Sequence, residues 1–236
     1  MNPEIKITKK QYNNLTKIIK RREKGEPVAY ILGYKDFMGL RFKVNRDVLI
    51  PRPETEQLVY KVYKGKKALK ILDLGTGSGC IAIALAKQLQ KSKIKYQVTA
   101  SDVSKKALKV ARQNAQTHKV KIIFKHSDIL QNVRMSFDVI IANLPYVTSG
   151  DYYRLKQNLK FEPKMALTDG TNRWETYKRF FEEVGKRLNP RAVIFLEIDP
   201  RSISKILIWI KKYLPKAKVR FYKDVNRLWR YAIIKN

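Results

Sequence analysis

Cysteine, histidine and acidic residues are all scarce in this chain of 236 residues. Its single cysteine, Cys80, excludes an internal disulfide and a cysteine-rich metal site, and two histidines are too few for a histidine cluster. No stretch is apolar over the length that a transmembrane helix needs, and the polar, basic first residues contain no signal-peptide core. We expect a cytoplasmic monomer without a bound metal ion and without a membrane anchor.

The scarcity of acidic residues leaves the chain very basic. Only 20 aspartates and glutamates stand against 51 lysines and arginines, which gives a formal net charge of +31. A positive field of this size attracts anionic partners and speeds their encounter, so a partner that contains nucleic acid, such as the ribosome, is one interpretation. The other is that lysine is simply the ordinary solvated residue here, because lysine-rich runs are spread along the whole chain. Both interpretations stay open, since charge bears on association and not on fold.

After residue 67 the hydrophobic pattern alternates between strands and helices. Strands are expected at residues 70–74, 97–102, 121–125, 139–142 and 192–197, and helices at about 80–90, 105–117, 174–188 and 202–213. Two more strands, 218–222 and 229–235, are joined by a short turn, so the last strand should run antiparallel. This order predicts an α/β fold with a mostly parallel, doubly wound sheet of seven strands.

The segment before residue 65 is too short for a second full domain. Apolar residues at about 5–24 have helical spacing, and the alternation around Gly39 predicts a β-hairpin. Two prolines, Pro51 and Pro53, form a stiff entry to a helix that should begin at Glu54 and end near residue 63. We expect residues 1–64 to form an N-terminal substrate-binding remnant, a linker at residues 65–67, and a catalytic domain over residues 65–236.

A glycine-rich loop, Gly75-Thr76-Gly77-Ser78-Gly79, joins the first strand of this domain to its helix. Glycines let the backbone turn tightly and approach a ligand, and free N–H groups at the helix start form a polar cradle. A dinucleotide fingerprint would place Gly or Ala where this chain has Cys80, which we interpret as a small buried filler.

Acidic residues end the next two strands. Asp102 is the natural acceptor for ribose hydroxyls, although a solvated strand end or helix cap is the plain alternative. Ser127 and Asp128 follow the third strand, where the amino group of an adenine would lie. Together with the loop, this arrangement resembles the class I S-adenosylmethionine methyltransferases from about residue 70 to the end of the chain.

The segment Asn143-Leu144-Pro145-Tyr146 follows the fourth strand, at the edge where doubly wound sheets place ligands. It resembles the Asn-Pro-Pro-Tyr motif of methyltransferases that alkylate planar amide or amino nitrogens. Such a nitrogen is a poor nucleophile, and acceptors for both of its N–H groups can aim its lone pair at the sulfonium methyl. The Asn143 oxygen and a backbone carbonyl of the turn would be these acceptors, and Tyr146 would stack on the planar group. Asn143, Pro145 and Tyr146 are therefore the candidate catalytic residues, with a plain strand-to-loop turn as the alternative.

Leu144 stands where a proline is usual, and this difference allows an alternative function. Asn-Leu-Pro-Tyr is common in ribosomal RNA adenine dimethyltransferases, and the basic chain would suit RNA. A third class is a cofactor-binding protein that has lost catalysis and serves as a basic module on the ribosome.

Further segments resemble the HemK/PrmC family of protein-glutamine N5-methyltransferases. They are residues 25–33, 48–56, 161–167 and 196–198. The resemblance implies that S-adenosylmethionine is the cofactor and that the substrate is the glutamine in the Gly-Gly-Gln loop of peptide chain release factors. RNA dimethyltransferases carry a different N-terminal signature.

The resemblance also assigns roles residue by residue. The implied cofactor contacts are Gly75, Thr76, Gly77, Ser78, Gly79, Asp102, Ser127, Asp128, Ile129 and Asn143. Asn143, Leu144, Pro145 and Tyr146 would hold the glutamine amide, and Arg52, Pro53 and Glu54 would wall the site. A structural brace is the alternative role for Arg52.

Besides Leu144, the chain departs from the family pattern near its start, at Asn172-Arg173-Trp174 and at residues 197–204. Only about 25 residues precede Gly25, where the family has a helical bundle that grips the release factor. The family's Glu-Ile-Gly becomes Glu197-Ile198-Asp199. These departures bear on the grip of the substrate more than on cofactor binding.

Overall fold

The computed structural model describes residues 7–62, 68–92, 95–171 and 174–236. A seven-stranded sheet has the order β5-β4-β3-β6-β7-β9-β8, and a separate hairpin pairs β1 with β2. The strands of the large sheet are β3 (Ala68–Leu74), β4 (Lys95–Asp102), β5 (Ile123–His126), β6 (Phe137–Ala142), β7 (Leu188–Glu197), β8 (Lys218–Lys223) and β9 (Trp229–Lys235). The last strand, β9, runs antiparallel to β7 and β8, whereas the pairs from β5 to β7 are parallel. The predicted α/β class and the antiparallel last strand are confirmed.

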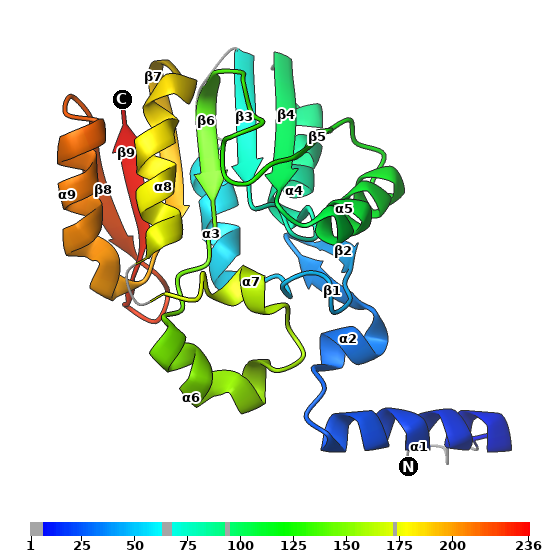
Figure 1. Cartoon of the computed structure of the whole chain (residues 1–236). Coiled ribbons are helices and arrows are strands. Elements are labelled where there is room, and N and C mark those ends of the chain that lie inside the picture. Colours follow the sequence, from blue (N-terminus) through cyan, green and yellow to red (C-terminus); the bar gives the residue numbers. More distant parts are fainter. Residues whose placement is uncertain (1–6, 63–67, 93–94, 172–173) are drawn as a thin grey trace.

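Helices cover both faces of this sheet. The helices α3 (Pro53–Val62), α4 (Cys80–Gln90) and α5 (Lys105–Thr117) pack on one another along one face, and α8 (Glu175–Val184) and α9 (Ile203–Tyr213) cover the other, in front of the sheet in Figure 1. The strands supply both cores by alternation: Ile71 and Ile141 join the cluster with α4, whereas Leu72 and Ile140 join the cluster with α8. Successive side chains of a strand point to opposite faces, so a strand buried on both sides is apolar throughout.

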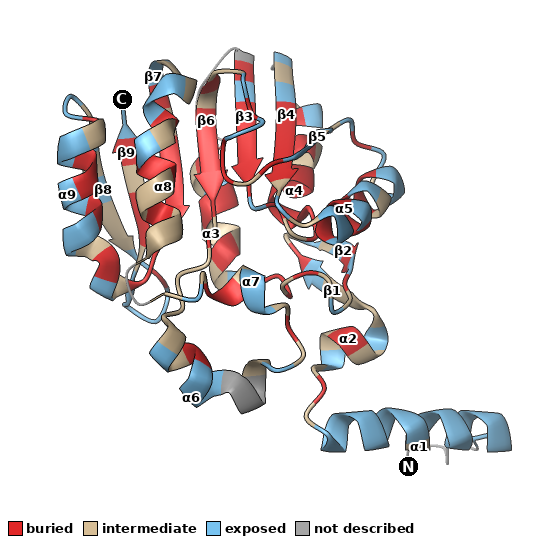
Figure 2. Cartoon of the chain, viewed as in Figure 1, coloured by how far each residue is buried: buried red, intermediate tan, exposed pale blue. Residues whose placement is uncertain are grey.

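The N-terminal segment forms α1 (Lys9–Glu23), α2 (Val28–Leu32), β1 (Tyr34–Phe37) and β2 (Leu40–Lys43). Thr8 and Gln11 cap the start of α1 reciprocally, yet no residue of this helix is buried, and Figure 2 shows it extending from the body as an exposed rod. The hairpin is different, because Phe37 and Phe42 are buried in the same cluster as Leu58 of α3. The predicted hairpin is confirmed; the domain boundary at residue 64 stays a prediction, and the expected linker at 65–67 lies outside the described residues.

Several elements differ from the sequence expectation. Three short helices were not predicted: α2, α6 (Ser149–Leu159) and α7 (Lys164–Leu167). The strand predicted at 121–125 lies at Ile123–His126, and the helix predicted at 174–188 ends at Val184. A 3-10 turn follows it, and β7 begins at Leu188 because a register shift opposite Phe137 absorbs the Asn189-Pro190-Arg191 segment.

One buried side chain, Asn114 of α5, ties the hairpin to the glycine-rich loop. Its Oδ1 accepts the N–H of Lys43 at 2.8 Å, and its Nδ2 donates to the carbonyls of Lys43 (3.0 Å) and Ser78 (2.8 Å). An amide satisfied on both sides in this way joins three segments that are far apart in the sequence.

Replacing Asn114 with alanine should lower the free energy of unfolding by about 1 to 3 kcal/mol, because the backbone groups of Lys43 and Ser78 lose their partners in a buried place. Guanidinium unfolding followed by circular dichroism measures this change. Gln116→Ala, at an exposed position of the same helix, is the matched control. Equal unfolding midpoints for the two variants would show that the hydrogen bonds of Asn114 do not stabilise the fold.

Candidate active site

The register of the parallel strands brings the predicted site residues to one edge of the sheet. Leu74 at the end of β3 lies opposite Ser101 of β4 and Ala142 of β6, and Ala142 lies opposite Leu196 of β7. The next residue of each strand or loop therefore emerges at the same edge, where open α/β sheets bind ligands. In Figure 1 this is the lower edge, above α7.

A cavity of about 290 Å³ opens at this edge. Nine of the predicted site residues line it: Gly75, Gly77, Asp102, Ser127, Asp128, Ile129, Asn143, Leu144 and Pro145. Segments that were not assigned to the site also line it, among them residues 47–49, members of the stretch from Pro163 to Asp169, and Thr176 and Arg179 of α8. The lining residues thus come from seven separate stretches of the chain, which meet at the strand ends.

Three predicted loop residues, Thr76, Ser78 and Gly79, do not line this cavity. The Thr76 hydroxyl turns inward and donates to Oδ2 of Asp73 at 2.6 Å, and the same oxygen accepts the N–H of Ala82 at 3.1 Å. Burial raises the pKa of Asp73 to about 7. Asp73 and Thr76 therefore hold the glycine-rich loop in place from its buried side.

Gly79 serves packing. It adopts a left-handed conformation with φ +83°, and a Cβ there would lie 3.0 Å from Ile83 and 3.1 Å from Ala111. The first turn of α4 can approach α5 this closely only without a side chain. At Gly77, by contrast, a Cβ would meet no atom within 4 Å, so this glycine leaves backbone open toward the cavity.

Asp102 holds the loop while presenting its carboxylate to the cavity. Its Oδ2 accepts the N–H of Gly77 at 2.9 Å, and its Oδ1 accepts the N–H of Ser104 at 2.8 Å. Burial raises the pKa of Asp102, and these backbone donors oppose the rise. Each oxygen keeps a second lone pair, so the carboxylate can still accept hydrogen bonds from a diol.

The residues after β5 form a tight corner in the cavity wall. The Ser127 hydroxyl donates to the carbonyl of Ile129 (3.0 Å) and accepts the N–H of Asn132 (3.0 Å), which holds Ile129 in an uncommon left-handed conformation. Asp128 forms an ion pair of 2.7 Å with Arg179 of α8. Ser127 therefore organises the corner, and Ile129 supplies an apolar surface.

A second, smaller cavity of about 150 Å³ adjoins the first. Both are lined by Leu49, Asn143, Leu144 and Ala166, so Asn143 stands between them. The smaller cavity is also lined by Arg52, Tyr146, Val147, Leu159, Leu167 and Glu197. Two joined cavities with an asparagine at the junction can hold two reactants against each other.

The side chains around this junction are hydrogen-bonded. Asn143 Nδ2 donates to Thr55 Oγ1 at 3.3 Å, Thr55 donates to Glu197 Oε2 at 2.7 Å, and the Tyr146 hydroxyl donates to Glu197 Oε1 at 3.0 Å. The Trp174 indole donates to the carbonyl of Tyr146 at 3.1 Å. Burial raises the pKa values of both Glu197 and Tyr146, so the phenol stays protonated.

The segment before α3 reaches the smaller cavity through Arg52. Its guanidinium pairs with the buried carboxylate of Glu162, which also accepts the N–H of Ile50 at 3.1 Å. Pro53 and Glu54, which were predicted beside it, line neither cavity, and the carbonyl of Glu54 accepts the hydroxyl of Tyr231. Arg52 thus both lines the cavity and braces its wall.

Sequence reasoning did not assign Thr55, Glu162 and Glu197 to the site. Each stands within a segment that resembles the HemK/PrmC family, which was the one available signal. Thr55 lies 88 positions from Asn143 of the motif loop (residues 143–146), and Glu197 lies 142 positions from Thr55, so nearby residues predict neither contact. Cys80 is buried, and burial raises the pKa of its thiol to about 12, which keeps it protonated. Among the described residues no group of three or more His, Cys, Asp and Glu side chains could hold a metal ion, and no helix could span a membrane.

Residues 54–185 match the family model of the methyltransferase small domain, and residues 1–33 match that of the PrmC N-terminal domain. The T. thermophilus 16S rRNA N2 G1207 methyltransferase, solved with AdoMet and guanosine, has a TM-score of 0.57 at 15% identity, over 86% of this chain and 48% of that one, and shows the fold alone. The fold and the loops at its strand ends thus define a class I S-adenosylmethionine-dependent methyltransferase.

Two relatives narrow the class to a family. The release factor glutamine methyltransferase of Lactococcus lactis is 39% identical over 223 residues, which cover 93% of this chain and 81% of the relative. That of Bacillus cereus is 34% identical over 236 residues, which cover 96% and 82%. The chain belongs to the family of release factor glutamine methyltransferases.

Replacing Asp102 with alanine should weaken the binding of S-adenosylhomocysteine by about 1 to 3 kcal/mol, because hydrogen bonds to a charged acceptor are lost. Titration calorimetry measures the dissociation constant. Asp47→Ala, at another carboxylate that lines the same cavity, is the control for charge alone. An unchanged constant in the Asp102 variant would remove this residue from the binding site.

Proposed function

We propose that this protein transfers a methyl group from S-adenosylmethionine to the side-chain amide nitrogen, N5, of the glutamine in the Gly-Gly-Gln motif of peptide chain release factors. The observation that carries the proposal is the position of Asn143, at the junction of two cavities of unequal size. The larger cavity has the form that a nucleoside needs, with the Asp102 carboxylate, the apolar Ile129 and the open backbone at Gly77. The smaller cavity has room for a glutamine side chain.

When bound, S-adenosylmethionine supplies an electrophilic methyl group on a sulfonium. The residues of the chain have to aim the amide nitrogen at it. The Asn143 side-chain oxygen and the backbone carbonyl of Leu144 would accept the two N–H groups of the glutamine and hold its lone pair in line. Both acceptors also stabilise positive charge that grows on the nitrogen during transfer.

No strong base is needed in this scheme, because the amide nitrogen becomes acidic as it is alkylated. Among the described residues, the Cys80 thiol is buried and protonated, and both histidines have hydrogen bonds to backbone carbonyls, those of Arg41 and Val103. Tyr146 is neutral and anchored through its hydroxyl on Glu197, which leaves its ring face to cover the planar amide.

Two observations favour a release factor over RNA as the substrate. Two curated relatives that match 93% and 96% of this chain carry the name release factor glutamine methyltransferase, and the match to the PrmC N-terminal domain lies outside the shared catalytic fold. The intact Asn143 and Tyr146, both at the smaller cavity, favour an enzyme over a protein that has lost catalysis.

The test is a transfer assay with radiolabelled S-adenosylmethionine, given either a release factor or small-subunit ribosomal RNA. We expect label in the release factor, none in the RNA, and none in a release factor whose Gly-Gly-Gln glutamine is alanine. Asn143→Ala should lower kcat by about 100- to 1000-fold, because its oxygen acts mostly in the transition state, while the affinity for S-adenosylhomocysteine stays near that of the wild type. Label in the RNA instead would overturn the assignment, and loss of cofactor binding in the variant would make the Asn143 loop structural.

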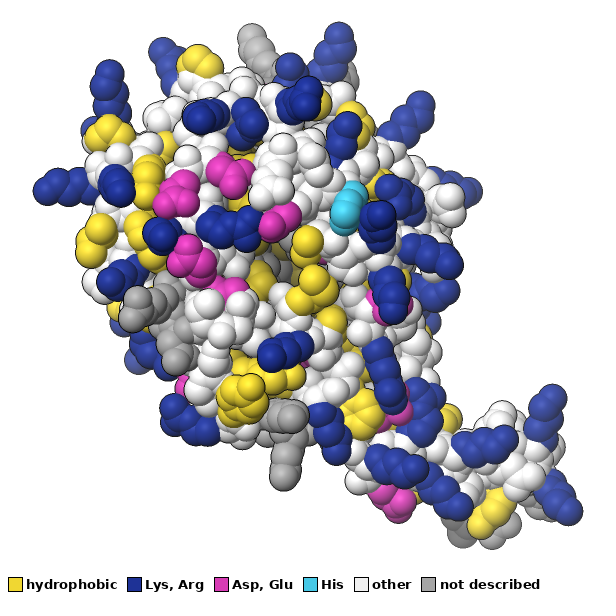
Figure 3. All heavy atoms as spheres, in the orientation of Figure 1, with side chains coloured by type: hydrophobic (Ala, Val, Ile, Leu, Met, Phe, Trp, Pro, Cys, Tyr) yellow, Lys and Arg dark blue, Asp and Glu magenta, His cyan; other side chains and the backbone are white. Residues whose placement is uncertain are grey.

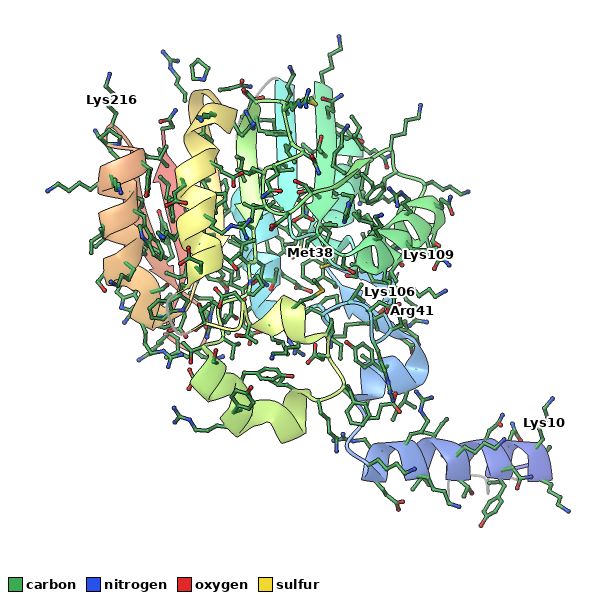
Figure 4. The ribbon with its side chains drawn as sticks, in the orientation of Figure 1. Lys10, Met38, Arg41, Lys106, Lys109 and Lys216 are labelled. Carbon is green, nitrogen blue, oxygen red and sulfur yellow. The ribbon has the colours of Figure 1, made fainter. Side chains whose placement is uncertain are left out.

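The basic surface bears on how the partner arrives. Figure 3 shows lysine and arginine side chains over most of the visible face, with few acidic ones between them. Lys10, Lys109 and Lys216 in Figure 4 lie on widely separated parts of the molecule and point away from it. Positive charge is therefore spread over the visible face, and we propose that it attracts an anionic partner from a distance, an acidic face of the release factor first and RNA of the ribosome second.

Methylation should accordingly depend on salt through KM. Salt shortens the screening length to about 8 Å at physiological strength, so KM for the release factor should rise steeply with salt while kcat changes little. Initial rates from low to high salt measure both constants. A flat KM would mean that the lysines add nothing to docking, and the transfer activity would stand unaffected.

A further inference from the structure

A chain of hydrogen bonds lies behind the smaller cavity and links three elements. It runs from Asn143, after β6, through Thr55 in the first turn of α3 to Glu197 at the end of β7, with the Tyr146 hydroxyl on the other carboxylate oxygen. Thr55 is 3% and Glu197 is 2% exposed, so both side chains are almost fully buried. Neither was given a role in the transfer step.

The carboxylate of Glu197 determines which group donates and which accepts in each hydrogen bond of this chain. An ionised carboxylate only accepts hydrogen bonds, so both hydroxyls that contact Glu197 must donate to it. Thr55 has a single hydroxyl proton, and once it is given to Glu197 the Thr55 oxygen can only accept from Asn143. Asn143 must therefore turn its NH₂ group toward Thr55, and its Oδ1, on the opposite side of the planar amide, away from Thr55.

We propose that Thr55 and Glu197 are positioning residues that hold the Asn143 amide in the one orientation that accepts a hydrogen bond from the substrate glutamine. This inference rests on the proposed function and explains why the Asn143 oxygen, and not its NH₂ group, faces the substrate. With the amide reversed, the NH₂ group of Asn143 would face the NH₂ group of the glutamine, and two donors cannot bond. A buried hydrogen-bonded network whose members are all satisfied is well suited to keep one orientation.

This donor-to-acceptor order requires an ionised Glu197, and the groups around Glu197 determine its protonation state. Arg230 of β9 favours the ionised carboxylate, as do the hydroxyls of Thr55 and Tyr146, whereas burial and the charge of Glu54 favour the protonated form. Tyr177 of α8 donates to the backbone carbonyl of Glu197, and Tyr231 of β9 also lies in its field. Burial dominates, so the pKa of Glu197 lies above that of an ordinary glutamate.

Protonation would release the constraint. A neutral Glu197 can donate to Thr55, which then has its own proton free to give to the Asn143 oxygen and so to reverse the amide. Activity should therefore fall as the pH drops through the raised pKa of Glu197, at a higher pH than an ordinary glutamate would cause.

The first test compares two substitutions of Thr55 in the full chain. Thr55→Val keeps the shape and removes the hydroxyl, and should lower kcat for release factor methylation by at least tenfold, with KM for S-adenosylmethionine within twofold of the wild type. Thr55→Ser keeps the hydroxyl and should retain at least a third of wild-type kcat. Thr117→Val, which removes an exposed hydroxyl bonded only within α5, is the matched control and should change nothing. A kcat in Thr55→Val equal to that of Thr117→Val would overturn the proposal.

Two further measurements separate positioning from a merely structural loss. In an Asn143→Ala background, Thr55→Val should cause no additional decrease, because the residue acts through Asn143. Glu197→Gln should abolish the acid limb of the kcat–pH profile, since an amide does not titrate there. An additive loss in the double variant, or an unchanged acid limb, would contradict the assignment.

A readout without turnover keeps this inference distinct from the proposed function. In ¹⁵N-labelled protein, the side-chain NH₂ signal of Asn143, identified by its absence in Asn143→Ala, should exchange slowly with solvent in the wild type and in Thr55→Ser. It should exchange several-fold faster in Thr55→Val. If no release factor is methylated but this pattern holds, the proposed function fails and the positioning chain stands; equal exchange in all three proteins would refute the chain itself.

Discussion

The central parallel strands β3, β4, β6 and β7 are buried on both faces over the residues that lead to their carboxyl ends, and the rest of the molecule depends on that constraint. Their side chains alternate between two apolar cores, so a shift of any strand by one residue would exchange the two sets of contacts. A fixed register means that the ends of β3, β4, β6 and β7 lie at defined positions along one edge. The loops that follow can then form cavities whose walls come from distant segments, because their anchor points do not move.

Three buried polar side chains turn this edge into a defined site. Asp73 holds the glycine-rich loop from behind, Asn114 joins that loop to the hairpin, and Glu197 joins α3 to the motif loop. Burying such groups is costly unless they are hydrogen-bonded, and each of them has at least two partners. The same bonds that offset their burial restrict the loops to one arrangement, which is what positioning a reactive nitrogen within a few tenths of an ångström requires.

The charges of the surface differ from those of the candidate site in number and in arrangement. Lysine and arginine side chains are spread over the visible face in Figure 3, and α1 has none of its residues buried although Tyr12, Leu15 and Ile19 are apolar. The interior chemistry instead depends on single carboxylates with one or two donors each. In the proposed function, long-range attraction and short-range orientation belong to separate parts of the protein, and a change of salt should act on the first alone.

The sequence by itself determined the fold class, the antiparallel last strand and the edge of the sheet at which the site forms. The signals were local: alternating apolar residues, a glycine-rich turn after one strand, and Asn143-Leu144-Pro145-Tyr146 after another. It also predicted Asp102, Asn143 and Tyr146 for the candidate site, and they line the cavities at this edge because residues at or shortly after the ends of parallel strands emerge there.

The tertiary structure decided which neighbours complete these residues. It turned Thr76 inward to Asp73, gave Arg52 a partner in Glu162, and brought Thr55 and Glu197 together behind Asn143. It also inserted the short helices α2, α6 and α7 and carried β7 through Pro190. The pairs Arg52–Glu162, Thr55–Asn143 and Thr55–Glu197 have no local signal, because their members lie 88 to 142 positions apart and meet only when the packed sheet brings the segments within hydrogen-bond distance.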